Sequence, residues 1–244
     1  MPDPSSKLQI VFWKWTHPSR LHILFDFTAD VVNRRRQELA RHLSIPHEVV
    51  CITDNPNGLD SEIRAIPLWS EGADMGGCWR RLRAFSPEMR DVIGPRFAWI
   101  DLDSVILGPM DDILGRTEDL VLYRSNSIQG TPYNGSLLLM SAGSKAEVWN
   151  SFDPATARAI VAEAGYNGTD QAWISHTLGP DQPVWTREDG VMHFTKDCIP
   201  DLPPQSRIVF FPGPQKMHMP NARRHAPWIA ALEQAEQDRA AAGN

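Results

Sequence analysis

Short apolar segments separated by polar loops make up the first part of the chain. The segments Leu8–Trp13, His47–Thr53 and Ile63–Leu68 each have the length and apolar character of a strand. Between the first two, apolar residues recur at helical spacing over about Ala29–His42, directly after Thr28, whose side chain suits an N-cap. This order of strand, helix, strand and strand predicts an α/β fold.

A later apolar run, Phe97–Leu107, contains two carboxylates, Asp101 and Asp103. In an extended segment these two side chains point to the same face, and the apolar residues before them predict a buried strand. Pro109 ends the extended run and can open a helical turn at Met110–Leu114. Two like charges held side by side repel each other unless a cation neutralises them. The pair therefore predicts a site for magnesium or manganese at the carboxyl end of a strand.

The remaining pattern predicts further strands and helices without an internal repeat or a linker, so we expect a single domain. They are a helix at about Trp79–Phe85, strands at Leu120–Tyr123 and Leu137–Met140, helices at about Lys145–Phe152, Pro154–Ala164 and Asp170–Leu178, short strands near Val191–Phe194 and Arg207–Phe211, and a C-terminal helix at about Pro227–Ala241.

Composition narrows the class of protein. The net charge of −6 over 244 residues argues against general nucleic-acid binding, which needs a basic surface. Three widely spaced cysteines without a Cys-x-x-Cys pair fit neither a disulfide framework nor a zinc site, and favour a reducing cytoplasm. We recognise no signal peptide and no apolar run long enough to cross a membrane. The basic cluster Arg34-Arg35-Arg36 is interpreted as a solvated helix face.

Several motifs occur together in a recognisable order, and they are, in chain order, Asp101-Leu102-Asp103, Tyr133-Asn134-Gly135-Ser136, Gly168-Thr169-Asp170-Gln171-Ala172-Trp173 and Phe210-Phe211-Pro212-Gly213. Together they resemble a GT-A-fold glycosyltransferase, close to glycosyltransferase family 8 and to a poorly characterised bacterial and phage group. The resemblance implies a GT-A-like, Rossmann-like fold with a mixed, mostly parallel central sheet. It places a nucleotide-binding half at about residues 8–107, a sugar and acceptor half at about 108–218, and a C-terminal helix at 225–242.

The resemblance also implies a role for the paired carboxylates. In the family, the segment matching Asp101, Leu102 and Asp103 binds Mn²⁺ (or Mg²⁺), which bridges the diphosphate of a nucleotide sugar. The segment Trp79-Arg80-Arg81-Leu82 is similar to the family's aromatic-x-Lys/Arg-Leu helix start, which brings a cation near the donor phosphates. Arg81 is the expected residue, because a guanidinium holds phosphate bidentately. A surface arginine is the alternative.

Two further motifs imply residues around the transferred sugar. Asn134 and Ser136 resemble residues that contact the donor sugar or the acceptor, although both could instead form hydrogen bonds within their turn. Asp170 and Gln171 resemble a pair beside the reacting carbon, where charge stabilisation contributes most to catalysis. As first-turn residues after Thr169, they could also simply cap a helix.

The nucleoside is expected at the loop after the first strand and at the turn after the second, where Lys14, Thr53 and Asp54 are candidate contacts. Lys196 could reach the phosphates, or be solvated.

The last motif departs from the family. Gly213 and Lys216 match donor-binding residues, but the histidine expected immediately before the glycine is replaced by Pro212, which cannot bind a metal. His218 is the nearest substitute as a third metal ligand, and His193 is another.

The expected function is therefore a metal-dependent glycosyltransferase that moves a sugar from a nucleotide diphosphate donor, most simply a UDP-sugar, to an acceptor hydroxyl, with retention implied by the resemblance. The acceptor could be a glycan, a lipid-linked glycan or a small molecule. Three alternatives remain. Pro212 favours a catalytically weak nucleotide-sugar-binding protein. The Asp-x-Asp pair also occurs in haloacid-dehalogenase-like phosphohydrolases, but there it follows the first strand. A nucleotidyltransferase would need an N-terminal glycine-rich phosphate loop, which is missing.

Overall fold

The structure, a computed structural model, describes residues 7–16, 27–124 and 130–241. Within these residues one sheet has seven strands in the order β3-β2-β1-β4-β7-β6-β8. Its strands are β1 (Leu8–Lys14), β2 (His47–Thr53), β3 (Ile63–Pro67), β4 (Arg96–Ile100), β6 (Leu120–Arg124), β7 (Tyr133–Ser141) and β8 (Val184–Trp185). Strand β7 runs antiparallel to both of its neighbours, whereas the other pairs are parallel. The expected mixed, mostly parallel sheet is confirmed.

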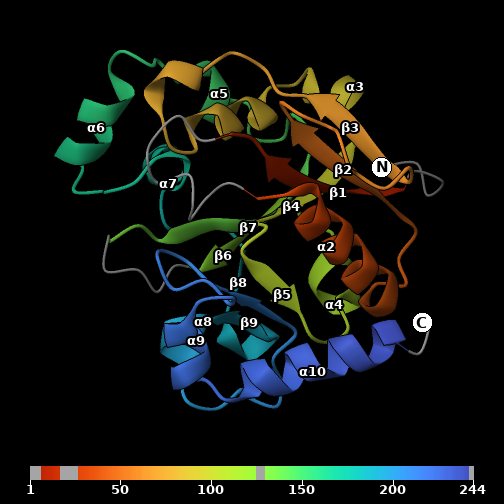
Figure 1. The fold of residues 1–244 in the computed structure, drawn as a ribbon. Coiled ribbons are helices and arrows are strands. Elements are labelled where there is room, and N and C mark those ends of the chain that lie inside the picture. The colour runs from red at the N-terminus through yellow and green to blue at the C-terminus, as the bar shows by residue number, and fades with distance from the viewer. Residues whose placement is uncertain (1–6, 17–26, 125–129, 242–244) are drawn as a thin grey trace.

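The two faces of this sheet carry separate cores because successive side chains of β1 alternate between them. Ile10 and Phe12 pack with Val32 and Leu39 of α2 (Ala29–His42) on one face. Val11 belongs to the core of the other face, which is covered by several helices. The helices of that second face are η2 (Trp79–Phe85), α3 (Met89–Val92), α5 (Glu147–Asn150), α6 (Ala157–Glu163) and α7 (Asp170–Leu178). Figure 1 shows these layers, with α2 on the opposite side of β1 from α3, α5 and α6.

The buried strand predicted before Asp101 is confirmed as β4, but the extended run does not continue unbroken to Leu107. Strand β4 ends at Ile100, and β5 (Ser104–Ile106) joins a second sheet of order β5-β10-β9, with β9 (Val191–His193) and β10 (Ile208–Phe210). Between them, the Asp101 amide donates to Ser136 O (2.9 Å), and the Phe211 amide donates to Asp103 O (2.7 Å). The carboxylate pair thus lies in the turn that joins the two sheets.

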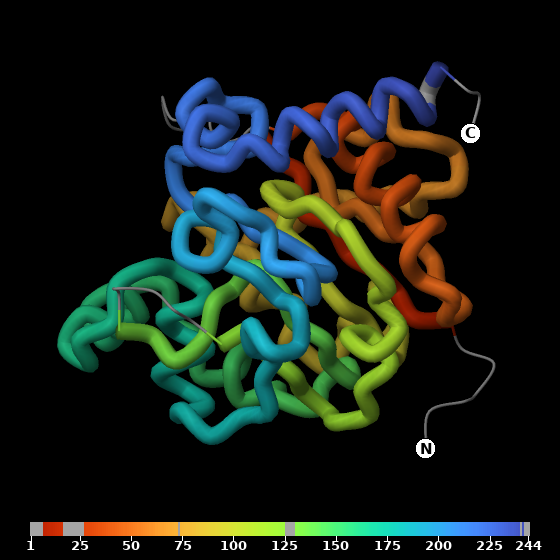
Figure 2. Tube along the Cα trace, turned by 90° about the horizontal axis from the view of Figure 1, so that it is seen from below, coloured from red at the N-terminus to blue at the C-terminus, as the bar shows by residue number. Residues whose placement is uncertain are grey.

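The C-terminal part surrounds this second sheet. Its elements are η3 (Arg187–Asp189), α8 (Phe194–Asp197), α9 (Pro220–His225) and α10 (Trp228–Ala241), and α4 (Asp111–Leu114) follows β5. Phe194, Phe211 and Ile229 belong to the buried cluster that joins β9, β10 and α10. In both Figure 1 and Figure 2, α10 runs across this part of the molecule toward α2.

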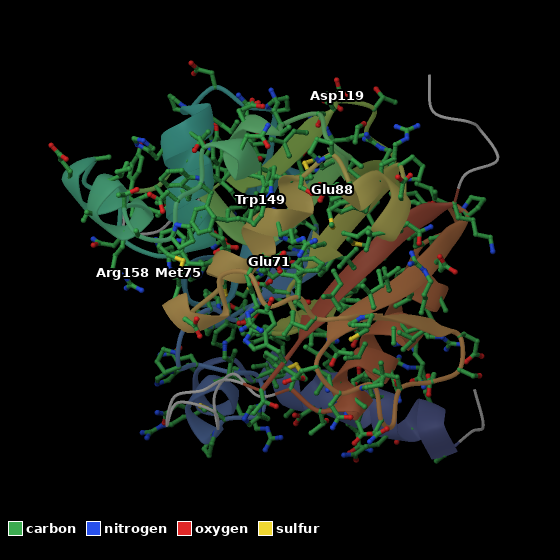
Figure 3. The ribbon with its side chains drawn as sticks, turned by 90° about the horizontal axis from the view of Figure 1, so that it is seen from above. Glu71, Met75, Glu88, Asp119, Trp149 and Arg158 are labelled. Carbon is green, nitrogen blue, oxygen red and sulfur yellow. The ribbon has the colours of Figure 1, made fainter. Side chains whose placement is uncertain are left out.

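Most predicted elements are found close to their expected bounds, with local differences. The segment Trp79–Phe85 is a 3₁₀-helix, and Thr28 makes no side-chain hydrogen bond as an N-cap. The structure also contains a 3₁₀-helix that the sequence did not predict, η1 (Ala73–Met75). It is held by Arg158 of α6, which donates to Met75 O (2.8 Å), and the two residues lie side by side in Figure 3.

The cluster Arg34-Arg35-Arg36 is only partly the solvated face that the sequence predicts. Arg35 is buried and forms an ion pair with Glu38. Glu38 in turn accepts a hydrogen bond from the Ile106 amide (3.0 Å), which ties α2 to β5. A buried carboxylate needs such partners. Among the described residues, no helix has the length and apolar character needed to cross a membrane.

Candidate active site

A cavity of about 220 Å³ lies where β1 and β4 end. Its wall combines aromatic side chains with the carboxylate pair, and consists of Trp13, Trp15, Phe27, Gly77, Cys78, Arg81, Asp101, Leu102 and Asp103. The ends of parallel strands are where α/β sheets bind their ligands. The structure therefore places Arg81 and the Asp-x-Asp segment around one cavity, as the sequence motifs require.

Arg81 joins two carboxylates that are far apart in the sequence. Its Nε and one terminal nitrogen donate to Asp170 Oδ2 (2.8 and 2.6 Å), and the other terminal nitrogen donates to Asp101 Oδ1 (2.5 Å). Both Arg81 and Asp170 are buried. Burial alone would lower the pKa of Arg81, but the charges of Asp101 and Asp170 raise it by more. The pKa of Arg81 therefore lies well above its ordinary value. Arg81 is thus a charged bridge inside the cavity wall, which excludes the alternative of a surface arginine.

The Arg81 guanidinium also lies on the Trp99 ring, 5.2 Å from its centroid. Trp99 Nε1 donates to Gly135 O (2.9 Å), so the indole is fixed in turn. A Cβ atom at Gly135 would lie 3.0 Å from an Arg81 nitrogen and 3.2 Å from Asp170 Oδ2. Gly135 is therefore required for the close approach of β7 to the bridge, which the sequence motif alone did not explain.

Asp103 has a cation partner of its own. Lys216, which is buried, donates from Nζ to Asp103 Oδ2 (2.5 Å) and to Phe211 O (3.0 Å). Burial raises the pKa of Asp103, whereas the Lys216 ammonium opposes that shift and Asp101 adds to it. Within the described residues, Asp103 Oδ1 is buried and has no hydrogen-bond partner.

These contacts change the reason for expecting a metal. The sequence predicts that Asp101 and Asp103 need a cation, but Arg81 already supplies positive charge to Asp101 and Lys216 supplies it to Asp103. Three carboxylates still surround these two cations once Asp170 is included. The free buried oxygen of Asp103 fits a hard cation, which typically takes one or two carboxylates together with phosphate oxygens and water. The metal stays a prediction.

Within the part of the chain that the structure describes, no third protein ligand lies beside the pair. Among the described residues, no group of three or more His, Cys, Asp and Glu side chains could hold a metal ion. His218 is exposed, and it lines a neighbouring cavity of about 170 Å³ together with Asp103 and Lys216. His193 instead pairs its ring with the Thr195 hydroxyl (3.2 Å). A direct role for His218 also stays a prediction.

The residues expected around the sugar lie near the Arg81 bridge. Gly135 N donates to Gln171 Oε1 (3.3 Å), and Asn134 Oδ1 accepts from the Ser136 amide (2.8 Å). Asn134 therefore makes the turn hydrogen bond that was its alternative role. Asp170 begins α7, and the Thr169 hydroxyl donates to Asp170 Oδ1 (3.1 Å) without capping the helix. Burial raises the pKa of Asp170, and the Arg81 charge opposes this shift.

The expected nucleoside contacts form a network of their own at the ends of β1 and β2. Lys14 is buried, and its Nζ donates to Thr53 Oγ1 (3.3 Å) and to Asn55 O (2.8 Å). Asp54 Oδ2 accepts from the Thr16 amide (2.8 Å). Lys14 also lines a cavity of about 250 Å³ beside Trp15. These residues shape this end of the site, while Lys196 is an exposed residue of α8.

Sequence reasoning missed the aromatic part of the site. Trp13 contacts Trp15, Trp69 and Trp99 edge to face, with centroids 6.4, 5.3 and 5.9 Å apart. Arg80 and Arg83 lie over Trp15 and Trp69, as Arg81 does over Trp99. The sequence feature that could have indicated this cluster is the basic run after Trp79, because each of its three arginines lies over a different indole ring.

Known proteins resemble this chain in structure but not detectably in sequence. No protein-family model matches the chain, and no curated protein is similar to it at a significant level. Among solved structures it is similar to the galactosyltransferase LgtC in complex with donor and acceptor sugar analogues, with 13% identity, a TM-score of 0.60, and coverage of 93% of this chain and 96% of LgtC. It is also similar to the glycosyltransferase GlyE of Streptococcus pneumoniae TIGR4, with 13% identity, a TM-score of 0.55 and coverage of 88% and 57%.

A third similar structure is the bifunctional glycosyltransferase WbbM, with 10% identity, a TM-score of 0.54 and coverage of 87% of this chain and 47% of WbbM. The chain thus spans about half of GlyE and WbbM and nearly all of LgtC. These similarities show that the chain has the fold of GT-A glycosyltransferases, as the motifs predicted.

Proposed function

We propose that this protein is a glycosyltransferase that moves a sugar from a nucleotide diphosphate donor, most simply a UDP-sugar, to an acceptor hydroxyl. The observation that carries the proposal is the Asp101–Arg81–Asp170 bridge, whose Asp101 and Arg81 line a cavity at the strand ends of a GT-A fold. The bridge places the Asp-x-Asp turn beside the first turn of α7. A site that binds a diphosphate and the sugar attached to it needs these two elements together.

Asp101 and Asp103 would hold a divalent cation together with the donor diphosphate, with the free Asp103 Oδ1 as a ready ligand. When bound, such an ion neutralises the charge that develops on the departing diphosphate. Lys216 lies at the same carboxylate and carries a second positive charge for phosphate oxygens. Gly213, with a φ of +71°, makes the turn that brings this lysine inward.

At the proposed sugar end, Asp170 and Gln171 lie in the first turn of α7, next to Arg81 and Gly135. Arg81 holds Asp170 through its Oδ2 and Thr169 holds it through its Oδ1, so the carboxylate has a fixed position. Asp170 then acts by placing negative charge where the transferred sugar becomes cationic. Arg81 orients Asp101 and Asp170 at once, and remains a candidate contact of the donor. We include retention of the anomeric configuration in the proposal because the resemblance to family 8 implies it.

One alternative has support from particular observations. Pro212 replaces the expected histidine, and each carboxylate of the pair already has a cation partner. Both features are compatible with a protein that binds a nucleotide sugar but transfers it slowly. Donor binding without sugar release or transfer would favour this alternative. A phosphohydrolase of the haloacid-dehalogenase type is not supported, because the carboxylates follow β4, next to an antiparallel strand.

The test is a thermal-shift screen of nucleotide sugars with and without Mn²⁺. A ligand that binds only the folded state raises the melting temperature. We expect stabilisation by one donor together with the metal, and its loss in Asp101→Ala and Asp103→Ala. Asp91→Ala, at an exposed carboxylate of α3, is the matched control and should respond like the unmodified protein. Unchanged UDP affinity and metal dependence in both site variants, measured by calorimetry, would show the assignment to be wrong.

A further inference from the structure

A polar groove of about 500 Å³ lies between α2 and the C-terminal helices, outside the cavity described above. Helix α2 contributes Arg34 and Arg41, which stand on one face because they are seven residues apart. Arg223 of α9 and Arg239 of α10 face them across the groove. Figures 1 and 2 both show α10 passing close to α2, so the groove is formed by segments from opposite ends of the chain.

The groove is positive although the chain as a whole is acidic, with a net charge of −6. Its four arginines face only two glutamates, one of which, Glu233, pairs with Arg223 (2.7 Å). Within the described residues, Arg34, Arg41 and Arg239 form no ion pair. Because the arginines outnumber the glutamates that line the groove, positive charge remains uncompensated there, and an anion in the groove would reduce the repulsion among the guanidinium groups.

The groove also leads to the candidate active site. Arg34, Met217 and His218 line both the groove and the inner cavity of about 170 Å³ that contains Asp103 and Lys216. A ligand lying along α2 could therefore extend from Arg239 at the outer end to the carboxylate site. This continuity distinguishes the groove from an ordinary solvated helix face, which is what the sequence predicts for the cluster Arg34-Arg35-Arg36.

We propose that this groove binds the acceptor and that the acceptor is an acidic glycan, whose phosphate or carboxylate groups pair with Arg34, Arg41 and Arg239. That the bound glycan is the acceptor rests on the proposed transferase function. That the groove binds an anion does not. Arginine suits both kinds of oxyanion, because its planar guanidinium donates two parallel hydrogen bonds. The groups are exposed, so binding should weaken as salt is added.

The experiment uses the full chain and two labelled probes of equal length, a short oligogalacturonate and a neutral maltooligosaccharide. We expect the acidic probe to bind and the neutral one not to. The double variant Arg41→Gln/Arg239→Gln should bind the acidic probe on the order of tenfold more weakly, since each exposed charge pair contributes little alone. Arg90→Gln, an exposed arginine on α3 without an ion pair among the described residues, is the control and should bind normally.

Stabilisation by UDP with Mn²⁺, measured on the same variants, separates this proposal from the proposed function. Arg41 and Arg239 line only the outer groove, so their replacement should leave that stabilisation unchanged. If UDP fails to bind while the acidic probe binds through the arginines, the donor assignment fails and the anion site stands. Equal binding of both probes, undiminished binding by the double variant, or binding only to anionic lipid vesicles would each overturn the acidic-glycan site.

Discussion

Lys216 and Asp103, 113 positions apart in the chain, form an ion pair of 2.5 Å beside the cavity where a metal was expected. Lys216 is almost completely buried, with 3% of its side chain exposed, and Asp103 has 15% exposed. The loop after β10 thus supplies a tethered ammonium to the turn between β4 and β5. The negative charge of Asp103 is therefore compensated by a side chain of the protein itself.

Removal of that ammonium should destabilise the fold. In Lys216→Met, the partly buried Asp103 carboxylate loses its cation partner, and we expect a loss of roughly 3 kcal/mol in the free energy of unfolding at neutral pH. Asp103→Asn/Lys216→Met should recover part of this loss, because no unpaired charge remains. The double-mutant cycle is completed by urea unfolding of the unmodified protein, of Lys216→Met, of Asp103→Asn and of the double variant. Losses that simply add would mean that the pair contributes no coupling.

The same pair determines how Mn²⁺ acts in the absence of a donor. Because Arg81 and Lys216 already hold the carboxylates, we expect Mn²⁺ alone to stabilise the unmodified protein little. Lys216→Met opens Asp103 to the ion, and stabilisation of about 2.7 kcal/mol is expected when Mn²⁺ exceeds its Kd a hundredfold. Thermal unfolding with and without Mn²⁺ measures both. The control is Asp103→Asn/Lys216→Met, which should lose the response. Equal stabilisation of all three proteins would argue against a metal at this turn.

Local patterns predicted the elements well and the site only in part. The bounds of α2 and β2 follow directly from their apolar spacing and turn residues, which are local properties. The break of Phe97–Leu107 was missed because it depends on Ser136 and Phe211, distant residues that bind the backbone of the turn. Asp-x-Asp indicated a need for positive charge. That Arg81 and Lys216 supply it depends on tertiary contacts, which no periodicity encodes.

The three cysteines should be unreactive in the native protein. Burial raises the pKa of Cys51, Cys78 and Cys198 to about 12 in each case, although Cys78 lines the cavity. Since the thiolate is the reactive form, a disulfide reagent such as DTNB should react slowly at about pH 8 and quickly with all three after denaturation. The folded state holds these protons more tightly than the unfolded chain. Stability should therefore fall as the pH rises above the ordinary thiol pKa toward 12.

Two measurements check these statements, the absorbance of released thiol product and urea unfolding at increasing pH. Cys78→Ser is the informative variant for the cavity, because it removes the one thiol in the wall and leaves Cys51 and Cys198 in place. Rapid reaction of one thiol in the native protein, lost in Cys78→Ser, would contradict the raised pKa of that group.

Gly135 should tolerate no side chain, because of the Arg81 bridge. A methyl group there would stand 3.0 Å from Arg81 and 3.2 Å from Asp170, so the buried ion pair must shift by a few tenths of an ångström. We expect Gly135→Ala to cost about 1–3 kcal/mol in the free energy of unfolding and to weaken donor binding. Gly165→Ala is the control for donor binding: its φ of +78° makes an alanine there lose stability through backbone strain, but its Cβ meets nothing within 4 Å, so donor binding should be unchanged. A Gly135→Ala protein with unchanged stability and unchanged donor binding would mean that the bridge adjusts freely, and that its position does not determine the site.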